Sequence, residues 1–247
     1  MKTEMKTEMK TAIITSVYYP EYSKSKYDIV CKVLNNIPDY AGIDYDLFIL
    51  NDGTEDDRLD LFMRSYKPTG FCKSVNYTSR ENKGITKSLN ELLGKIDSSY
   101  DYICLLDLDV LIPVYWLKKC VSVLSEFNNA GICGVLVEDK LQFNLSKGIP
   151  QTKDSVLFAP TPSIGGACMV FRANELKGYG WDEELTSDHI DAYMILRYLN
   201  DRKFACAILD RGYHSREAYE SKEYIKMKER RFEQELPKFY SVMAKYS

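Results

Sequence analysis

The sequence has few of the residues on which zinc-binding and disulfide-rich domains depend. There are only two histidines among 247 residues, and the seven cysteines include no Cys-x-x-Cys pair. Cysteines that are odd in number, widely spaced and surrounded by apolar residues do not suggest a metal or disulfide framework. We therefore expect reduced cysteines in the core of a cytoplasmic protein.

The chain also lacks the long apolar run that a membrane-spanning helix needs. Such a helix takes about 20 mostly apolar residues, whereas the longest candidate, residues 103–117, contains two aspartates. No Gly-x-Gly-x-x-Gly motif follows a strand-like run, which disfavours a dinucleotide-dependent dehydrogenase. The net charge of -3 provides no overall attraction to nucleic acid or to an anionic membrane. We expect neither a transmembrane segment nor a secretion signal.

Apolar runs alternate with helical periods through the first 110 residues. Strand-like runs rich in β-branched and aromatic residues cover residues 12–19, 45–50 and 102–106, with a shorter run at 74–77. Between them, apolar residues recur at helical spacing over residues 24–38 and 84–96. This alternation predicts an α/β domain with a mostly parallel central sheet flanked by helices.

The second half of the chain continues this pattern less regularly. We expect helices over 115–128 and 188–199 and strands over 130–137 and 205–209. Residues 138–162 have no clear period and contain several prolines, which predicts a long loop. An amphipathic stretch that predicts a helix packed by one face follows residue 215.

These segments predict a single domain with short additions at both ends. The domain extends over residues 11–215, with halves at 11–110 and 111–215. The polar extension before it, residues 1–10, repeats Met-Lys-Thr-Glu, and a helical segment, residues 216–247, follows it.

Two carboxylates stand where a buried strand should end. Asp107 and Asp109 follow the apolar run 102–106 directly. An ionised carboxylate is costly to desolvate unless it is paired or bound to a cation, and two of them one residue apart repel each other. A divalent metal ion is the simplest remedy, although Asp-x-Asp alone occurs in many unrelated proteins.

The order of five segments resembles the GT-A catalytic domain of family 2 glycosyltransferases. The segments are Ile13–Val17, Ile49–Asp56, Arg80–Asn90 with its Asn-x-Gly loop, the Asp-x-Asp strand, and residues 165–183 with Gly-Gly and Gly-Tyr-Gly-Trp-Asp-Glu. Each is weak alone, but their order is specific. The chain departs from the family at Asn51, where an acidic residue is usual, and at residues 187–191, where the usual acidic pair is replaced by Ser-Asp-His-Ile-Asp.

This resemblance implies a GT-A fold with a mixed, mostly parallel sheet, and a metal-dependent sugar transfer from a nucleotide diphosphate sugar. Residues 11–110 would bind the donor, with a UDP-sugar favoured, and residues 111–215 would bind the acceptor. Asp109 would coordinate Mn²⁺ or Mg²⁺ directly, and Asp107 would reach the ribose or the ion through water. His214 would be a further metal ligand; alternatively it is a surface histidine, and one aspartate only caps a turn.

The resemblance also assigns residues to the nucleotide. Thr15 and Tyr18 belong to the first strand and its end, and Asp52 would accept a hydrogen bond from an N–H of uracil or a similar base. The alternative for Asp52 is a turn residue before Gly53. Asn82 and Lys83 precede a helix start, where backbone N–H groups or the lysine charge could meet phosphate or ribose; the alternative is simple helix capping.

On the acceptor side, an inverting transfer needs a carboxylate that takes the acceptor proton. Asp191 is the first candidate and Asp188 the second; both also fit the start of a helix, where aspartate commonly caps. Gly165 and Gly166 would let the acceptor approach the backbone closely, and Trp181 would form an acceptor platform. The glycines and the tryptophan are equally compatible with packing.

Two other functions compete with sugar transfer. The run Cys104–Val110 also fits the signature of haloacid dehalogenase-like phosphatases, in which Asp107 would be the nucleophile, but that leaves the preceding hundred residues unexplained. A GT-A scaffold that binds nucleotide without catalysis is the second alternative. The sequence leaves open the acceptor, which could be a glycan, a protein, a lipid carrier or a modified nucleic acid, as well as the stereochemistry and the oligomeric state.

Overall fold

The computed structural model describes residues 9–19, 24–136, 150–161, 164–185, 189–214 and 222–246, with only the backbone for parts of the last strand and the final helix. In these residues, eight strands form one sheet in the order β3-β2-β1-β4-β8-β6-β9-β7. The strands are β1 (Thr11–Val17), β2 (Tyr45–Asp52), β3 (Cys72–Arg80), β4 (Tyr102–Leu106), β6 (Ala130–Leu136), β7 (Phe158–Pro160), β8 (Cys168–Arg172) and β9 (Phe204–Arg211).

The sheet is mixed. Strands β3, β2, β1 and β4 are parallel to one another, and β6 is parallel to β9. β8 runs antiparallel between β4 and β6, and β7 is antiparallel to β9. A second, two-stranded sheet pairs β5 (Val110–Leu111) with β10 (Tyr213–His214). The predicted mixed, mostly parallel sheet is therefore confirmed.

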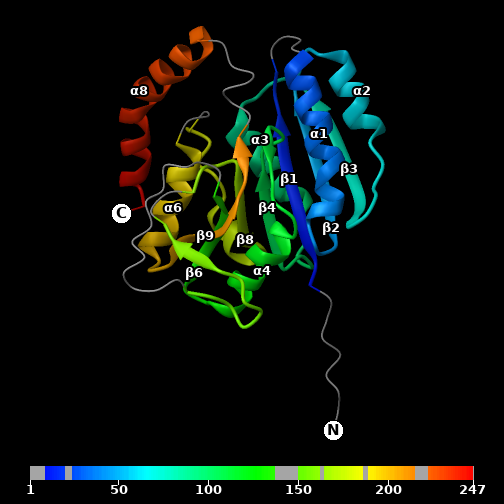
Figure 1. Ribbon diagram of the computed structural model, residues 1–247. Helices are drawn as coiled ribbons and strands as arrows, with labels where there is room; N and C mark the ends of the chain where they lie inside the picture. Colours follow the sequence, from blue (N-terminus) through cyan, green and yellow to red (C-terminus); the bar gives the residue numbers. More distant parts are fainter. Residues whose placement is uncertain are drawn as a thin grey trace.

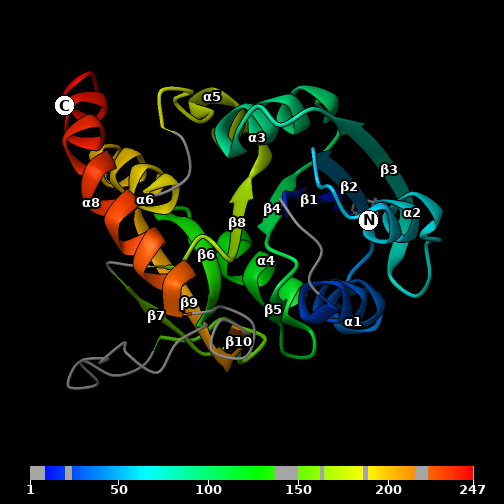
Figure 2. The ribbon, with the colours of Figure 1, turned by 90° about the horizontal axis from the view of Figure 1, so that it is seen from above.

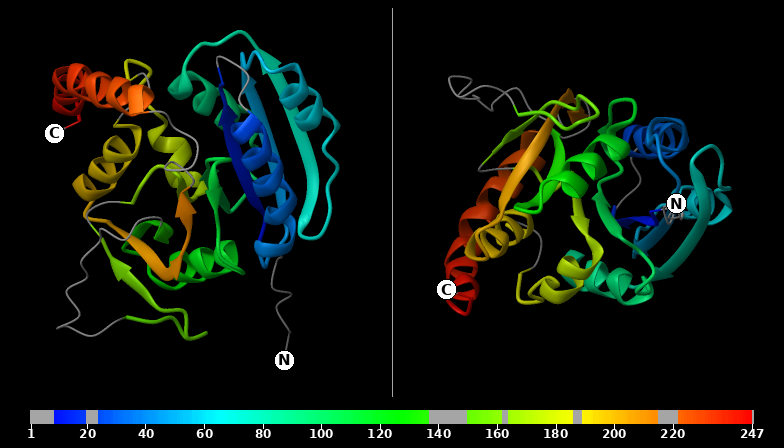
Figure 3. Two further views of the ribbon diagram at one scale, coloured as in Figure 1. Left: turned by 45° about the horizontal axis from the view of Figure 1, so that its top comes forward. Right: turned by 90° about the horizontal axis from the view of Figure 1, so that it is seen from below.

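Helices cover both faces of the sheet, as Figures 1 and 2 show. The helices are α1 (Lys24–Tyr40), α2 (Asp57–Ser65), α3 (Ile85–Lys95), α4 (Trp116–Glu126), α5 (Ala173–Tyr179), α6 (Ile190–Asn200) and α8 (Lys222–Ala244). Side chains of α1, α2 and α4 form one core cluster with the sheet, and side chains of α3, α5, α6 and α8 form the other. The domain consequently has three layers, with α8 lying against α6 in all views (Figures 1–3).

Alternation along β1 explains why two cores form. Successive side chains of a strand point to opposite faces, so that Ile13 packs in one cluster and Ile14 in the other. Both are fully buried. A strand with both faces covered has a continuous run of apolar residues, and this run made β1 predictable from the sequence.

Most predicted elements are present, with shifted ends. The strand expected at 74–77 extends over Cys72–Arg80, and α2, α5, β8 and β7 were not predicted as elements. β7 lies within the expected loop 138–162, of which residues 138–149 and 162 lie outside the described residues. Residues 1–8 lie outside them too. No helix in the described part of the chain combines the length and the apolar character that crossing a membrane requires.

Candidate active site

The Asp-x-Asp segment lies at the edge of the sheet where the parallel strands end. Asp107 follows β4, and its backbone N–H donates to the carbonyl oxygen of Ala167 over 2.9 Å. The preceding residue, Leu106, is paired with Cys168 across the antiparallel β4–β8 ladder. Both aspartates are half-buried, and Leu108 between them is buried. The pair is therefore held against the segment that leads into β8.

The second sheet brings the end of the chain's last strand to the same place. Val110 is the register partner of His214, and Leu111 is the partner of Tyr213. The backbone of His214 thus lies one residue from Asp109 along the ladder. The side chain of His214 is outside the described residues, so its role as a metal ligand stays a prediction.

Asp191 lies beside the predicted glycine pair. A Cβ atom built on Gly166 would lie 3.5 Å from Cβ of Asp191, while one built on Gly165 would meet nothing within 4 Å. Asp191 is half-buried in the first turn of α6, and its Oδ1 accepts the N–H of Ala192 over 2.8 Å. Because Gly166 adjoins Ala167, which binds Asp107, the predicted base and the Asp-x-Asp segment flank one short stretch of chain. Asp188 lies outside the described residues.

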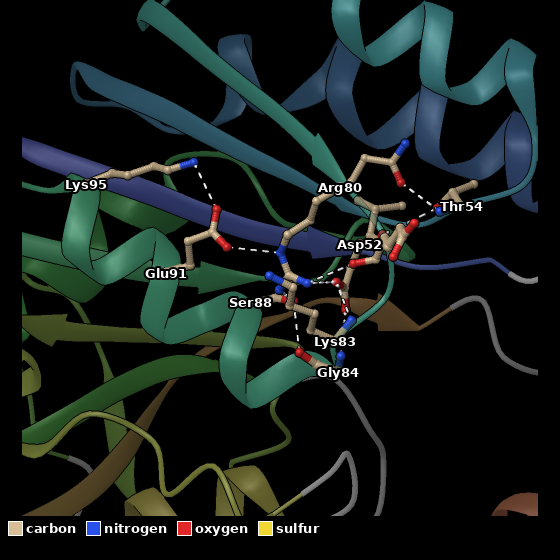
Figure 4. Close-up of polar contacts among 11 residues, drawn as sticks. Asp52, Thr54, Arg80, Lys83, Gly84, Ser88, Glu91 and Lys95 are labelled. Carbon is tan, nitrogen blue, oxygen red and sulfur yellow. Dashed lines mark hydrogen bonds and ion pairs between the residues drawn. The ribbon is translucent and has the colours of Figure 1, made fainter.

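Asp52 forms the centre of a polar network at the ends of β2 and β3 (Figure 4). Its Oδ1 accepts the N–H of Lys83 over 3.0 Å, and its Oδ2 accepts the N–H of Gly84 over 3.0 Å. The same Oδ1 lies 2.7 Å from Nη1 of Arg80, and the Asp52 side chain is only 2% exposed. A carboxylate with three charge-assisted contacts is strongly held.

This geometry corrects two predictions. The Asp52 carboxylate is nearly covered and both its oxygens bind protein groups, so it is not poised to accept an N–H from a base. The backbone N–H of Lys83 binds Asp52 and therefore does not face a phosphate. The side chains of Asn82 and Lys83 are exposed, and their contact with phosphate or ribose stays a prediction.

Arg80 connects this network to α3 (Figure 4). Its Nη2 donates to Oγ of Ser88 over 2.9 Å, and its Nε lies 3.0 Å from a carboxylate oxygen of Glu91. Glu91 in turn lies 3.3 Å from Nζ of Lys95. The charges along Asp52, Arg80, Glu91 and Lys95 alternate, which compensates their partial desolvation. The arginine was quoted in the motif but given no role, because its partners are far apart in sequence.

The turn after β2 packs directly against the loop before α3. Gly53 has a φ of +83°, and a Cβ atom there would lie 2.7 Å from the backbone N of Asn82. Only glycine fits both the conformation and the space. The glycine after Asp52 thus lets this turn pack against the Asn-x-Gly loop at residues 82–84.

Tyr18 and Thr15, both predicted to bind nucleotide, differ in accessibility. Tyr18 follows β1 and is 47% exposed, whereas Thr15 is 0% exposed within β1. The prediction for Thr15 is wrong for a direct contact, because its hydroxyl is sealed in the sheet. Tyr18 is near the end of β2, since Val17 pairs with Asn51, and its contact with the nucleotide stays a prediction.

Trp181 is a core residue. It is 4% exposed and packs in the cluster formed with α3 and α6. Its backbone is fixed by Asn90, whose Nδ2 donates to the Trp181 carbonyl over 2.8 Å and whose Oδ1 accepts the Trp181 N–H over 2.9 Å. The predicted acceptor platform is therefore wrong, and the sequence reasoning missed Asn90 as the residue that joins the two halves.

The donor set fits a hard divalent cation. Asp107 and Asp109 provide carboxylate oxygens at a partly exposed strand end, and such oxygens suit Mn²⁺ and Mg²⁺. Within the residues that the structure describes, no group of three or more histidine, cysteine or acidic residues forms a complete metal-binding cluster.

A family model and several solved structures match this chain. The model described as glycosyl transferase family 2 matches residues 16–177. A mannosyltransferase from Pyrobaculum calidifontis, in complex with GDP-Man and Mn²⁺, has a TM-score of 0.64 and 14% identity, over 91% of this chain and 61% of that one. TarS 1-349 from S. aureus has a TM-score of 0.55 and 17% identity, over 85% and 59%.

A third structure, GalNAc-T7 with UDP, GalNAc and Mn²⁺, has a TM-score of 0.60 and 11% identity, over 85% of this chain and 44% of that one. At these identities the structures establish the fold alone. The chain spans less than two thirds of the length of each of these three proteins. A search of curated protein sequences finds no match.

Proposed function

The chain belongs to glycosyl transferase family 2, and from that membership we propose that it transfers a sugar from a nucleotide diphosphate sugar to an acceptor hydroxyl. One observation carries the proposal. Asp107 binds Ala167 through its backbone, and Asp191 lies against the neighbouring Gly166. The carboxylates that would bind the diphosphate and the candidate base thus contact neighbouring residues of one segment, and a transfer between two bound substrates requires such proximity.

Asp107 and Asp109 would hold Mn²⁺ or Mg²⁺, with His214 as a further candidate ligand. The bound cation would supply charge neutralisation for the departing diphosphate. Two of the similar structures were solved as complexes with Mn²⁺, which supports this assignment. The position of both aspartates at the carboxyl end of a parallel strand supports it independently, because ligands of α/β sheets bind beyond such ends.

The nucleotide would lie along the neighbouring strand ends. Tyr18 is exposed there, and the side chains of Asn82 and Lys83 extend from a loop fixed by Asp52. The lysine charge would meet a phosphate, and the tyrosine ring would contact the base or ribose. We favour a UDP-sugar, while the similar structures include both a GDP-sugar and a UDP complex.

Asp191 would take the proton of the acceptor hydroxyl as that oxygen attacks the anomeric carbon. It is half-buried, so that it is reachable from solvent, and a Cβ atom on the nearby Gly165 would meet nothing within 4 Å. A base placed opposite the leaving group gives inversion at the anomeric carbon. We assign the base to Asp191, because it lies against Gly166.

The test is a panel of nucleotide sugars with Mn²⁺, scored by release of nucleoside diphosphate with water or added sugars as acceptor. We expect release from at least one donor, and loss of about 10²-fold or more in kcat for Asp191→Asn. Binding without release from any donor would favour the non-catalytic scaffold. Phosphate-ester hydrolysis without nucleotide-sugar use would favour the phosphatase, which the family match already disfavours.

A further inference from the structure

The final helix packs against both flanks of the segment that carries Asp191. On the preceding flank, Lys245 lies 2.5 Å from a carboxylate oxygen of Glu184, and the Tyr246 hydroxyl donates to Asp182 over 3.1 Å. Phe239 and Val242 of α8 are buried in the core cluster that also contains Leu185. The family match ends at residue 177, so that all of these contacts lie beyond it.

On the following flank, Arg197 of α6 stacks on the Tyr246 ring, with 3.8 Å from its guanidinium carbon to the ring centroid. Nδ2 of Asn200 donates to the carbonyl oxygen of Tyr246 over 3.1 Å. Both ends of the segment are thereby tied to the same end of the chain.

His189 is the contact between α8 and that first turn. Its ring centroid lies 4.0 Å from that of Phe232 and 5.0 Å from that of Phe239, against which it is stacked. Its Nε2 lies 3.2 Å from the carbonyl oxygen of Phe232, a hydrogen bond when that nitrogen carries the proton. The histidine is buried, at 6% exposure. All these partners belong to α8.

The backbone of His189 needs this support. It has a φ of 71°, in the left-handed region, and it precedes α6 without giving it a side-chain cap. Non-glycine residues are uncommon there and persist when surrounding contacts hold them. Its carbonyl oxygen accepts the N–H of Tyr193 over 2.8 Å, which starts the helix. Asp191 lies two residues further on, against Gly166.

We propose that His189 is a positioning residue, which transmits the packing of α8 to Asp191 and so sets the distance of that carboxylate from the acceptor. The proposal rests on the proposed function, since it assumes that Asp191 is the base. It implies that the C-terminal helix, outside the matched family region, is part of the catalytic framework. It also gives a reason for a histidine in the segment that departs from the family pattern.

The test compares two variants that disturb this contact with one that does not. His189→Asn tolerates the left-handed conformation but removes the ring, and Phe239→Leu removes the stacking partner. Val123→Ala is the matched control, because Val123 is fully buried but lies in α4 and in the core cluster on the other face of the sheet. Thermal unfolding, donor KM and kcat for nucleoside diphosphate release are measured for each.

We expect kcat to fall about tenfold or more for both contact variants with donor KM within about twofold, because misplacement of a base slows proton transfer without weakening donor binding. Val123→Ala is expected to lower the melting temperature and leave kcat unchanged. Unchanged kcat in the folded contact variants would overturn the proposal. An equal loss of kcat in Val123→Ala would overturn it as well. Absence of release by the wild type would instead reject the proposed function.

Discussion

At the scale of single residues, Asn51 shows how a departure from the family pattern is built into the structure. Its Nδ2 donates to Oδ1 of Asp60 over 2.7 Å, and its Oδ1 accepts the N–H of Thr54 over 2.8 Å. The Tyr77 hydroxyl also donates to Asp60. An amide supplies both a donor and an acceptor, whereas a carboxylate at this position would face Asp60 without a proton to share.

We therefore predict that Asn51→Asp lowers the free energy of unfolding by about 1–3 kcal/mol, because a buried hydrogen bond is replaced by repulsion between carboxylates. Urea denaturation at neutral pH measures the loss. Asn76→Asp is the control, since Asn76 is exposed on the neighbouring strand and should change stability by less than about 0.5 kcal/mol. Equal stability of the two variants would contradict this account of Asn51.

The same cluster predicts acid sensitivity. Burial by itself raises the pKa of Asp60, but the hydrogen bonds from Tyr77 and Asn51 outweigh it, so that this pKa lies below its ordinary value of 3.8. A carboxyl whose pKa is lower in the folded state stabilises the fold above its unfolded pKa, and this contribution is lost as the pH falls through the folded pKa. In Asp60→Asn, the free energy of unfolding should therefore fall less steeply below about pH 4 than in the wild type. The same pH dependence in both proteins would contradict this account of Asp60.

At the scale of elements, the contact between β2, β3 and α3 is an ion network that fixes one loop. Arg80 is 12% exposed and binds Asp52, Ser88 and Glu91. Through Asp52, it orders the backbone of Lys83. The network thus makes the loop from residue 81 to residue 84 a rigid support for the side chains that we assign to the donor.

We predict that Arg80→Gln weakens binding of UDP, GDP and CDP by similar factors, because it loosens the loop and leaves the Asp52 carboxylate without its cation. Calorimetric titrations in the presence of Mn²⁺ measure this. Lys73→Gln, at the exposed other end of β3, should leave all three affinities unchanged. A change in base preference in Asp52→Asn with little effect of Arg80→Gln would instead favour direct recognition of the base by Asp52.

Local patterns predicted the elements whose signals are self-contained. Runs such as residues 102–106 are buried throughout in β4, and such runs read as strands without knowledge of their neighbours. Helix α2 was not predicted because only two of its nine residues, Leu59 and Met63, are buried. Two apolar positions are too few to show a helical period. Strand β7 has only three residues, ends in Pro160 and forms one edge of the sheet, so that turn signals dominate there.

The site was predicted only in part, for a related physical reason. The strand end carrying Asp107 and Asp109 is visible in the sequence, but the pairing of Asp52 with Arg80 depends on the register of two strands. The sequence left Trp181 open between an acceptor platform and a packing role, because the order of residues does not reveal its burial. The contact of His189 with α8 joins segments more than forty residues apart, and no local pattern signals it.

At the scale of the whole molecule, the buried cysteines lie on one face of the sheet, in the core cluster formed with α1, α2 and α4. Six of the seven cysteines are buried, and Cys31 is partly exposed. Burial raises the pKa of the thiols of Cys104 and Cys133, with hydrogen bonds to neighbouring cysteines acting in the same direction. Buried neutral thiols are inert. The cysteines therefore act as small apolar side chains of the core.

We predict that a thiol-reactive disulfide reagent modifies at most one thiol of the folded protein, slowly, and all seven cysteines in denaturant. The reaction of Cys31 should be slow because burial raises the pKa of its thiol. Cys31→Ser should abolish the reaction of the folded protein, because the other six cysteines are buried. Rapid modification of several thiols in the folded protein would contradict the packing of the core.

The central claim is that Asp107 and Asp109 hold a divalent ion that binds a nucleoside diphosphate. Calorimetric titration of UDP and GDP into the protein, with Mn²⁺ or with chelator, tests it most directly. We predict binding of at least one nucleotide with Mn²⁺, its loss with chelator, and a drop of about tenfold or more in Asp109→Asn that still folds. No metal-dependent binding of either nucleotide, or unchanged binding by Asp109→Asn, would contradict the claim.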